Sequence, residues 1–183
     1  MPQNSLSKQE EKSRFRVKHR KIGYLPVAIS VQRLVVLPFL ILSLQKGVVF
    51  AADSLFLLVI ATDFADGYIA RKLAVSSKLG ARLDVTIDFF FIFCMFLYFV
   101  AQGFYSVWLP LLIAVAFAQF LLSSLFSRLV YDPVGKYYGS LLYGAVGLSL
   151  LFSEALVHEV VTAGIIVSTL ILFLSRLVYL AKT

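Results

Sequence analysis

Long apolar stretches recur along the whole chain, and each of about 20 residues is long enough to cross a hydrocarbon core roughly 30 Å thick as a helix. Of the 183 residues, 60% are hydrophobic and only 15% are charged. A soluble core of this size could not bury so much apolar surface. The sequence therefore predicts an all-α, polytopic membrane protein with six transmembrane helices. We expect these spans at about residues 26–45, 51–71, 80–101, 107–129, 137–153 and 157–180.

The basic residues are distributed unevenly between the expected connections. With six spans both termini lie on one side, and that side receives nearly all Lys and Arg residues, whereas Lys46 falls on the other. Cytoplasmic connections are enriched in Lys and Arg, so we expect both termini in the cytoplasm. Residues 1–22 form a basic segment in which we expect a short interfacial helix on anionic lipid, with a disordered tail as the alternative. Residues 23–183 form one transmembrane domain.

The formal net charge of +7 bears on the choice of partner. On a membrane protein, a basic excess suggests anionic lipid or phosphate, and nothing in the sequence resembles a nucleic-acid-binding module. Cys94 is the only cysteine, so an intramolecular disulfide and a metal site built of thiolates are both excluded. His158 and Glu159 lie on the outer side without a third ligand, and we assign them no chemistry.

Four aspartates stand among the apolar segments within 26 positions. Asp63 and Asp66 are three apart near the end of the second span, and Asp84 and Asp88 are four apart at the start of the third. Each spacing places its pair on one helical face. The short polar connection makes the two helices antiparallel neighbours, so the two faces can meet at one depth near the cytoplasmic side.

Carboxylates in membrane helices are costly and need a partner charge, a polar cavity or a metal. Oxygen ligands without His or Cys favour Mg²⁺ or Mn²⁺, and four carboxylates suit a site for two ions that binds phosphate. Gly67 and Gly80 leave room on the same faces for a bulky ligand, although helix packing is an adequate alternative for either glycine alone.

The segment DFADGYIARKLAVSSKLGARLDVTID contains every fixed position of the pattern D-x2-D-G-x2-A-R-x8-G-x3-D-x3-D. The chain thereby resembles the CDP-alcohol phosphotransferase (CDP-alcohol phosphatidyltransferase) family. The resemblance implies that a phosphatidyl-type group passes from a CDP-linked lipid to the hydroxyl of a small alcohol, with release of CMP. It implies a site facing the cytoplasm and a homodimer. By similarity, the metal ligands are Asp63, Asp66, Asp84 and Asp88, with Asp88 also the general base, and the CDP-lipid is bound by Asp66, Gly67, Ala70, Arg71 and Gly80.

Details of the first span look most like the phosphatidylglycerophosphate and cardiolipin synthase branch, which has a proline, a hydroxyl residue, an arginine and a second proline. Here these are Pro26, Ser30, Arg33 and Pro38. Other marks of the branch are missing, since Gln119, Phe120 and Phe89 stand where charged residues are typical. Glycerol 3-phosphate is therefore slightly favoured as acceptor, while an inositol phosphate, serine or another alcohol stays open. The lipid donor is ester-linked or archaeal.

Four basic residues are candidates for binding a phosphorylated acceptor: Arg33, Arg128, Lys136 and Arg176. For the last three, the alternative is positive-inside topology with snorkelling side chains. For Arg33, which lies about two turns inside the first span, the alternative is pairing with one of the aspartates.

Two other classes of protein compete with the enzyme. A small transporter or cation channel would spread carboxylates along a pathway, whereas here they cluster near one face. A structural membrane protein without catalysis leaves the spacing of the aspartates unexplained.

Overall fold

The computed structural model describes the backbone of residues 25–73, 78–126 and 133–180, and the side chains of residues 31–63, 83–121 and 137–177. Within these ranges the regular secondary structure is all helical, and no strand occurs. The all-α expectation is confirmed for this part of the chain. The interfacial helix expected within residues 1–22 lies outside it.

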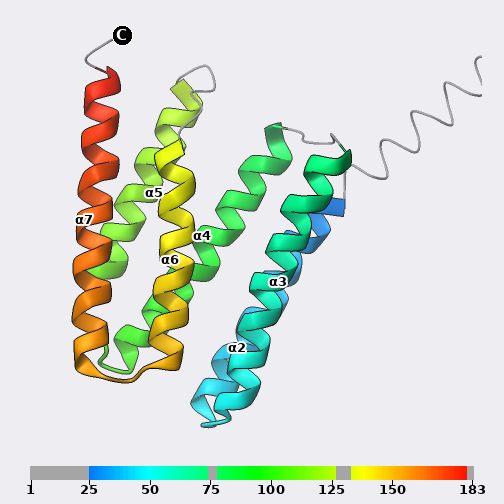
Figure 1. Cartoon of the computed structure of the whole chain (residues 1–183), viewed down its shortest axis with the longest axis vertical. Helices are drawn as coiled ribbons and strands as arrows, with labels where there is room; N and C mark the ends of the chain where they lie inside the picture. Colours follow the sequence, from blue (N-terminus) through cyan, green and yellow to red (C-terminus); the bar gives the residue numbers. More distant parts are fainter. Residues whose placement is uncertain (1–24, 74–77, 127–132, 181–183) are drawn as a thin grey trace, which may run out of the picture.

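Each expected apolar segment coincides with one helix, with ends that differ by a few residues. The helices are α2 (Leu25–Gln45), α3 (Val49–Leu73), α4 (Lys78–Ala101), α5 (Trp108–Phe126), α6 (Pro133–Leu151) and α7 (Ala155–Leu180). The start of α2 and the end of α7 lie at the same end of the bundle, as Figure 1 shows.

Two tight turns reverse the chain at the opposite end, and each depends on a glycine. Gly47 after α2 and Gly103 after α4 have φ angles of 69° and 80°, a left-handed conformation that costs glycine little. At the first turn the amide of Gly47 donates to the carbonyl of Leu44, and the amide of Val48 donates to that of Ser43. The pattern is a Schellman motif, which ends a helix and satisfies its last carbonyls. These turns make α2 and α3, and likewise α4 and α5, antiparallel neighbours.

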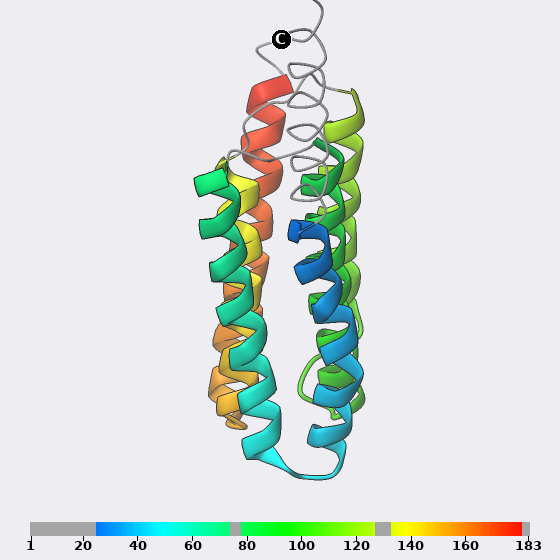
Figure 2. The same cartoon turned by 90° about the vertical axis from the view of Figure 1, so that its right-hand side faces the viewer.

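The helices of the described residues form two layers, seen edge-on in Figure 2: α3, α6 and α7 in one layer, and α2, α4 and α5 in the other. Helix α4 packs against α2, α5 and α6, and its buried side chains Phe91, Met95, Phe96 and Phe99 supply much of the core. The contact between α3 and α6 is narrower and passes through Gly147, where an added Cβ would lie 3.0 Å from the ring of Phe56.

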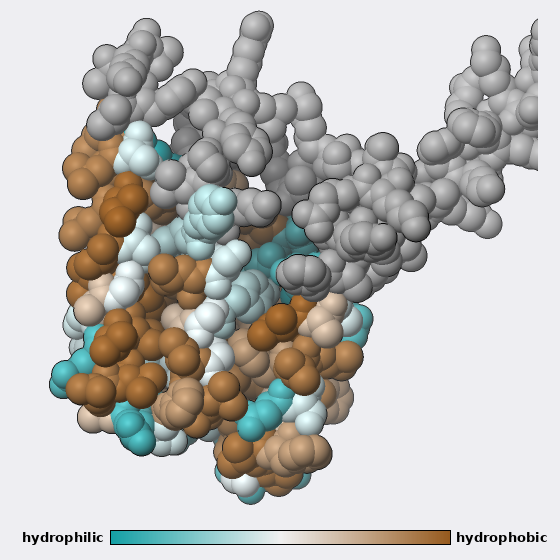
Figure 3. All heavy atoms as spheres, in the orientation of Figure 1, coloured by the Kyte–Doolittle hydropathy of each residue, from teal (hydrophilic) through white to brown (hydrophobic). Residues whose placement is uncertain are grey.

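The outside of the bundle is rich in large apolar side chains, which appear brown over most of the face in Figure 3. Phe50 is 85% exposed and Leu57 is 67% exposed, and many others on all helices are similarly open. Exposed apolar surface on this scale marks contact with lipid or protein. Within the described residues, Leu83–Ala101 and Ala155–Leu177 are long and apolar enough to cross a membrane, while α2, α5 and α6 contribute shorter apolar stretches. The exterior therefore fits a membrane protein.

Candidate functional site

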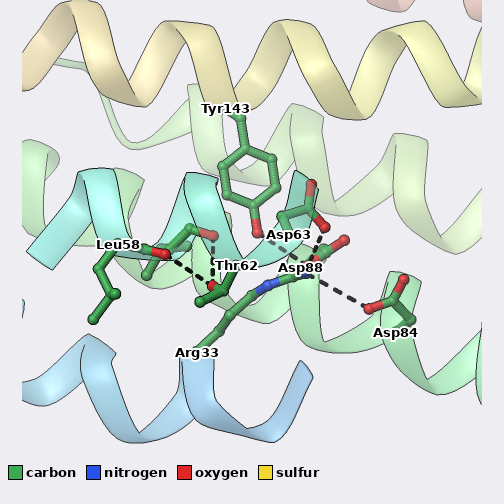
Figure 4. Close-up of polar contacts among 8 residues, drawn as sticks. Arg33, Leu58, Thr62, Asp63, Asp84, Asp88 and Tyr143 are labelled. Carbon is green, nitrogen blue, oxygen red and sulfur yellow. Dashed lines mark hydrogen bonds and ion pairs between the residues drawn. The ribbon is translucent and has the colours of Figure 1, made fainter. Parts of the chain in front are cut away.

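Three of the four aspartates converge on one guanidinium group, as Figure 4 shows. Arg33 of α2 uses Nη2 to pair with Oδ1 of Asp63 on α3, and uses Nη1 to pair with Oδ1 of Asp88 on α4. The same Nη1 lies 3.6 Å from Oδ1 of Asp84. The carboxylates of α3 and α4 therefore meet at one place, and α2 supplies the cation between them. Within the described residues α3 and α4 share almost no direct contact, and each packs on α2 instead, so the expectation that they are neighbours packed on each other is wrong.

Burial is unequal across this cluster. The side chain of Arg33 is only 1% exposed, whereas Asp63 is 47%, Asp84 is 43% and Asp88 is 24% exposed. Arg33 thus approaches the carboxylates from the protein interior, and the carboxylates open toward the outside. In their ionised forms, one guanidinium and three carboxylates carry a formal charge of −2. The cluster retains an excess of negative charge that can attract a further cation.

Tyr143 of α6 completes the surroundings of Asp88. Its hydroxyl donates a hydrogen bond of 3.0 Å to Oδ1 of Asp88, the same oxygen that pairs with Arg33. Thr62, beside Asp63, instead donates back to the carbonyls of Leu58 and Val59 and so does not join the cluster. Sequence reasoning did not identify Tyr143. No local spacing could have found it, because it lies 55 residues from its partner and on another helix.

For the other residues expected to bind the nucleotide and the metals, the structure describes only the backbone. Asp66, Gly67, Ala70 and Arg71 lie on α3 and Gly80 lies on α4, but their side chains are outside the described set. Asp66 follows Asp63 by three residues on one continuous helix, which keeps both on one face.

The candidate acceptor residues are not brought together by the described side chains. Arg33 belongs to the aspartate cluster, which is the alternative raised from its position in the first span. Arg176 lies on α7 with its guanidinium carbon 5.5 Å from the ring centre of Phe120 on α5. Lys136 is placed on α6 by its backbone, and Arg128 lies outside the described residues.

The donor chemistry of the cluster suits a hard divalent cation. Among the described side chains, no three His, Cys, Asp or Glu residues gather closely enough to hold one metal ion together. The donors that do converge are all carboxylate oxygens, and they already hold a cationic group. Such oxygen ligands match the preference of Mg²⁺ and Mn²⁺.

A separate open pocket of about 510 Å³ lies at the opposite end of the bundle, between the α4–α5 connection and the start of α7. Phe104, Trp108, His158 and Glu159 are among its lining residues. The ring of His158 stacks on Phe104 at 4.5 Å, and its Nε2 has no hydrogen-bond partner among the described residues. In the same connection, burial raises the pKa of the Tyr105 phenol. This pocket is not part of the aspartate cluster.

The family model of CDP-alcohol phosphatidyltransferases matches residues 23–179. This match runs from before α2 to the last turn of α7, and it includes the segment that carries the four aspartates.

Three curated relatives carry the same name, CDP-diacylglycerol--glycerol-3-phosphate 3-phosphatidyltransferase. The protein from Sodalis glossinidius is 31% identical over 98 residues, which are 52% of this chain and 53% of the relative. A Yersinia pestis protein (strain Pestoides F) is 30% identical over 105 residues, which are 55% of this chain and 57% of the relative. A Pseudomonas fluorescens protein is 35% identical over 94 residues, which are 50% of this chain and 48% of the relative. The matches thus span about half the length of these relatives.

Proposed function

The chain belongs to the CDP-alcohol phosphatidyltransferase family, and from this premise we propose that it transfers a phosphatidyl-type group from a CDP-linked lipid to a small alcohol. The observation that carries the proposal is the convergence of Asp63, Asp84 and Asp88, from two helices, on one cationic centre. The relatives are named for glycerol 3-phosphate as acceptor, and this favours the same phosphorylated alcohol here.

In this proposal Asp63, Asp66, Asp84 and Asp88 hold Mg²⁺ or Mn²⁺, with two ions expected from four carboxylates. When bound, the ions neutralise the pyrophosphate, polarise the attacked phosphorus and stabilise the departing CMP. Support comes from the excess negative charge of the cluster and from the outward exposure of its carboxylates.

Asp88 is the proposed general base. Its Oδ1 is engaged by Arg33 and Tyr143, which fixes the carboxylate and leaves Oδ2 to accept a proton. The acceptor hydroxyl gives its proton to Asp88 while its oxygen forms a bond to the phosphorus of the lipid phosphate. The bond from that phosphorus to the bridging oxygen breaks, and CMP leaves with the bonding electrons. No covalent intermediate with the protein is needed.

Substrate binding follows from the same helices. The small residues Gly67, Ala70 and Gly80 admit the nucleotide, while Asp66 and Arg71 contact it. We assign the acceptor phosphate to Arg128, Lys136 and Arg176, because the described contacts of Arg33 commit it to the aspartates.

The proposed setting is a membrane crossed by all six helices, with both termini and the aspartates toward the cytoplasm. Two observations support it: α2 begins and α7 ends at one end of the bundle, and the basic residues favour that end. A transporter or channel is less well supported, since Asp63, Asp84 and Asp88 gather around one arginine. Asp53, the other described carboxylate of these two helices, lies apart, near the start of α3.

The test uses the full chain purified in detergent with MgCl₂ and CDP-diacylglycerol, and follows CMP release. Glycerol 3-phosphate, inositol phosphate and serine are supplied in separate reactions. We expect CMP release to depend on one acceptor, to stop when EDTA removes divalent ions and to return with excess Mg²⁺. Acceptor-dependent release that persists in EDTA would contradict the metal-dependent mechanism, and absence of release with every acceptor would contradict the assigned substrates.

A further inference from the structure

We propose that Arg33 is the built-in counter-ion of the aspartate site. It holds Asp63, Asp84 and Asp88 together when no divalent cation is bound, and it lowers the affinity of the site for that cation. The inference rests on the proposed function, because it takes these aspartates as metal ligands. It assigns Arg33 a positioning role in place of contact with the acceptor.

The position of Arg33 on α2 prevents it from leaving the cluster easily. Val36, Leu37 and Leu40 follow it at spacings of three, four and seven residues, and all three are buried. Residues at these spacings share one helical face, so Arg33 projects from the core face of α2. A charge on a buried face is costly unless it is paired. The guanidinium is therefore expected to stay between α3 and α4 when a cation arrives.

The carboxylates can serve Arg33 and a metal ion at the same time. All three ion pairs with Arg33 use the Oδ1 atoms, and the side chains of Asp63 and Asp84 are nearly half exposed. A divalent cation can approach from the exposed side while Arg33 remains on the buried side. The two positive charges then share the same carboxylates and repel each other, which weakens cation binding.

Without Arg33 and without a cation, three carboxylates from α3 and α4 would face one another unneutralised. Their repulsion would oppose the packing of α3 and α4 on α2, which holds these carboxylates close together. The ion pairs of Arg33 stabilise the metal-free protein, and the same ion pairs weaken the binding of a metal ion. The two effects are linked, because coupling between two binding events is reciprocal. A change at Arg33 must therefore move both quantities, in opposite directions.

Thermal unfolding and metal binding measure these quantities without any assay of activity. Trp108, the only tryptophan of the chain, reports unfolding of the full chain in detergent by fluorescence, in EDTA and in saturating MgCl₂. Mn²⁺ binding is followed by electron paramagnetic resonance. For Arg33→Gln we expect the midpoint in EDTA to fall by roughly 5 °C or more. In saturating MgCl₂ we expect the midpoint of this variant to fall by less, and we expect it to bind Mn²⁺ roughly tenfold more tightly than the wild type.

Two further variants keep the test decisive. Arg33→Lys keeps the positive charge but lacks the two-pronged contact of the guanidinium. We therefore expect the same changes in unfolding midpoint and Mn²⁺ affinity, but smaller ones. This variant replaces Arg33→Gln if that variant does not fold. Leu109→Ala removes a fully buried side chain at the start of α5, among the residues of the separate pocket at the far end of the bundle. It should lower the midpoint equally in EDTA and Mg²⁺ and leave Mn²⁺ affinity unchanged.

The outcomes separate this inference from the proposed function. If Arg33→Gln behaves like Leu109→Ala, or binds Mn²⁺ more weakly than the wild type, Arg33 is not a counter-ion that competes with the metal. In that case the metal-dependent function stands. If the wild type binds no Mn²⁺ and gains no stability from Mg²⁺, the proposed metal site fails, and the inference fails with it.

Discussion

The hydroxyl of Tyr143 on α6 donates a hydrogen bond of 3.0 Å to Asp88 on α4, so a residue from the other helical layer orients the carboxylate proposed as the base. The ring of Tyr143 also stacks with Phe91 of α4, with centroids 5.9 Å apart. Both contacts fix the distance between α4 and α6 at the level of the aspartates. The orientation of Asp88 therefore depends on how the two layers pack.

Replacement of Tyr143 by Phe should slow turnover while leaving the ring contact in place. We expect kcat to fall by roughly tenfold, because a misplaced base loses part of the 10²–10⁴-fold contribution of general base catalysis. The KM for the CDP-lipid should change little. The measurement is the rate of CMP release. Tyr138→Phe is the matched control, since Tyr138 lies on the same helix but bonds to Thr169, and it should keep normal turnover.

Asp88→Asn should abolish turnover and largely preserve binding of the CDP-lipid. The variant lacks the proton acceptor, but three of the four proposed metal ligands remain. Binding of CDP-diacylglycerol is measured by isothermal titration calorimetry in detergent, beside CMP release. Wild-type turnover in this variant would remove Asp88 from its assigned role.

Neutralisation of Arg176 or Lys136 should affect the acceptor more than the lipid donor. We expect Arg176→Gln and Lys136→Gln to raise the KM for glycerol 3-phosphate by roughly tenfold, because a charge-assisted hydrogen bond to phosphate is lost. The KM for CDP-diacylglycerol should remain within about twofold, since neither residue is assigned to it. Equal increases for both substrates would argue against an acceptor-phosphate site at these residues.

The contact between α3 and α6 should tolerate no added carbon at Gly147. In Gly147→Ala the new methyl carbon lies 3.0 Å from the buried ring of Phe56, and we expect a loss of about 1–2 kcal/mol of stability from overpacking. Gly144→Ala is the control on the same helix, because nothing lies within 4 Å of its added Cβ. It should gain up to about 1 kcal/mol from higher helix propensity. Thermal unfolding monitored by Trp108 fluorescence compares the two, and equal midpoints would contradict the tight contact.

The helices and the meeting of the α3 and α4 carboxylates could be predicted because their signals are local. Apolar length fixed the six segments, and the spacings of Asp63 with Asp66 and of Asp84 with Asp88 fixed the carboxylate faces. The short connection between the two pairs predicted that α3 and α4 pack on each other, and this was wrong, because in the described residues both pack on α2 instead. The first two inferences needed no knowledge of how the remaining helices pack.

The two-layer arrangement could not be predicted from the same sequence. Lipid-facing and core-facing positions are both apolar, so residues such as the exposed Phe39 and the buried Leu40 look alike in the pattern. The contacts of Tyr143 with Asp88 and of Arg33 with Asp63 join residues 55 and 30 positions apart, and only the packed structure pairs them. The sequence alone therefore allows either acceptor binding or ion pairing for Arg33.

The order of the helices gives Arg33 a further consequence for biogenesis. In the six-span arrangement proposed above, α2 reaches the membrane insertion machinery before α3 and α4, and its arginine arrives ahead of every carboxylate that pairs with it. An unpaired arginine near the centre of a helix opposes insertion by roughly 2.5–3.5 kcal/mol. Stable integration of α2 must then wait for the two helices that follow. Helices α2, α3 and α4 would then enter the lipid as one cooperative unit, and a nascent chain truncated before Asp63 would integrate poorly.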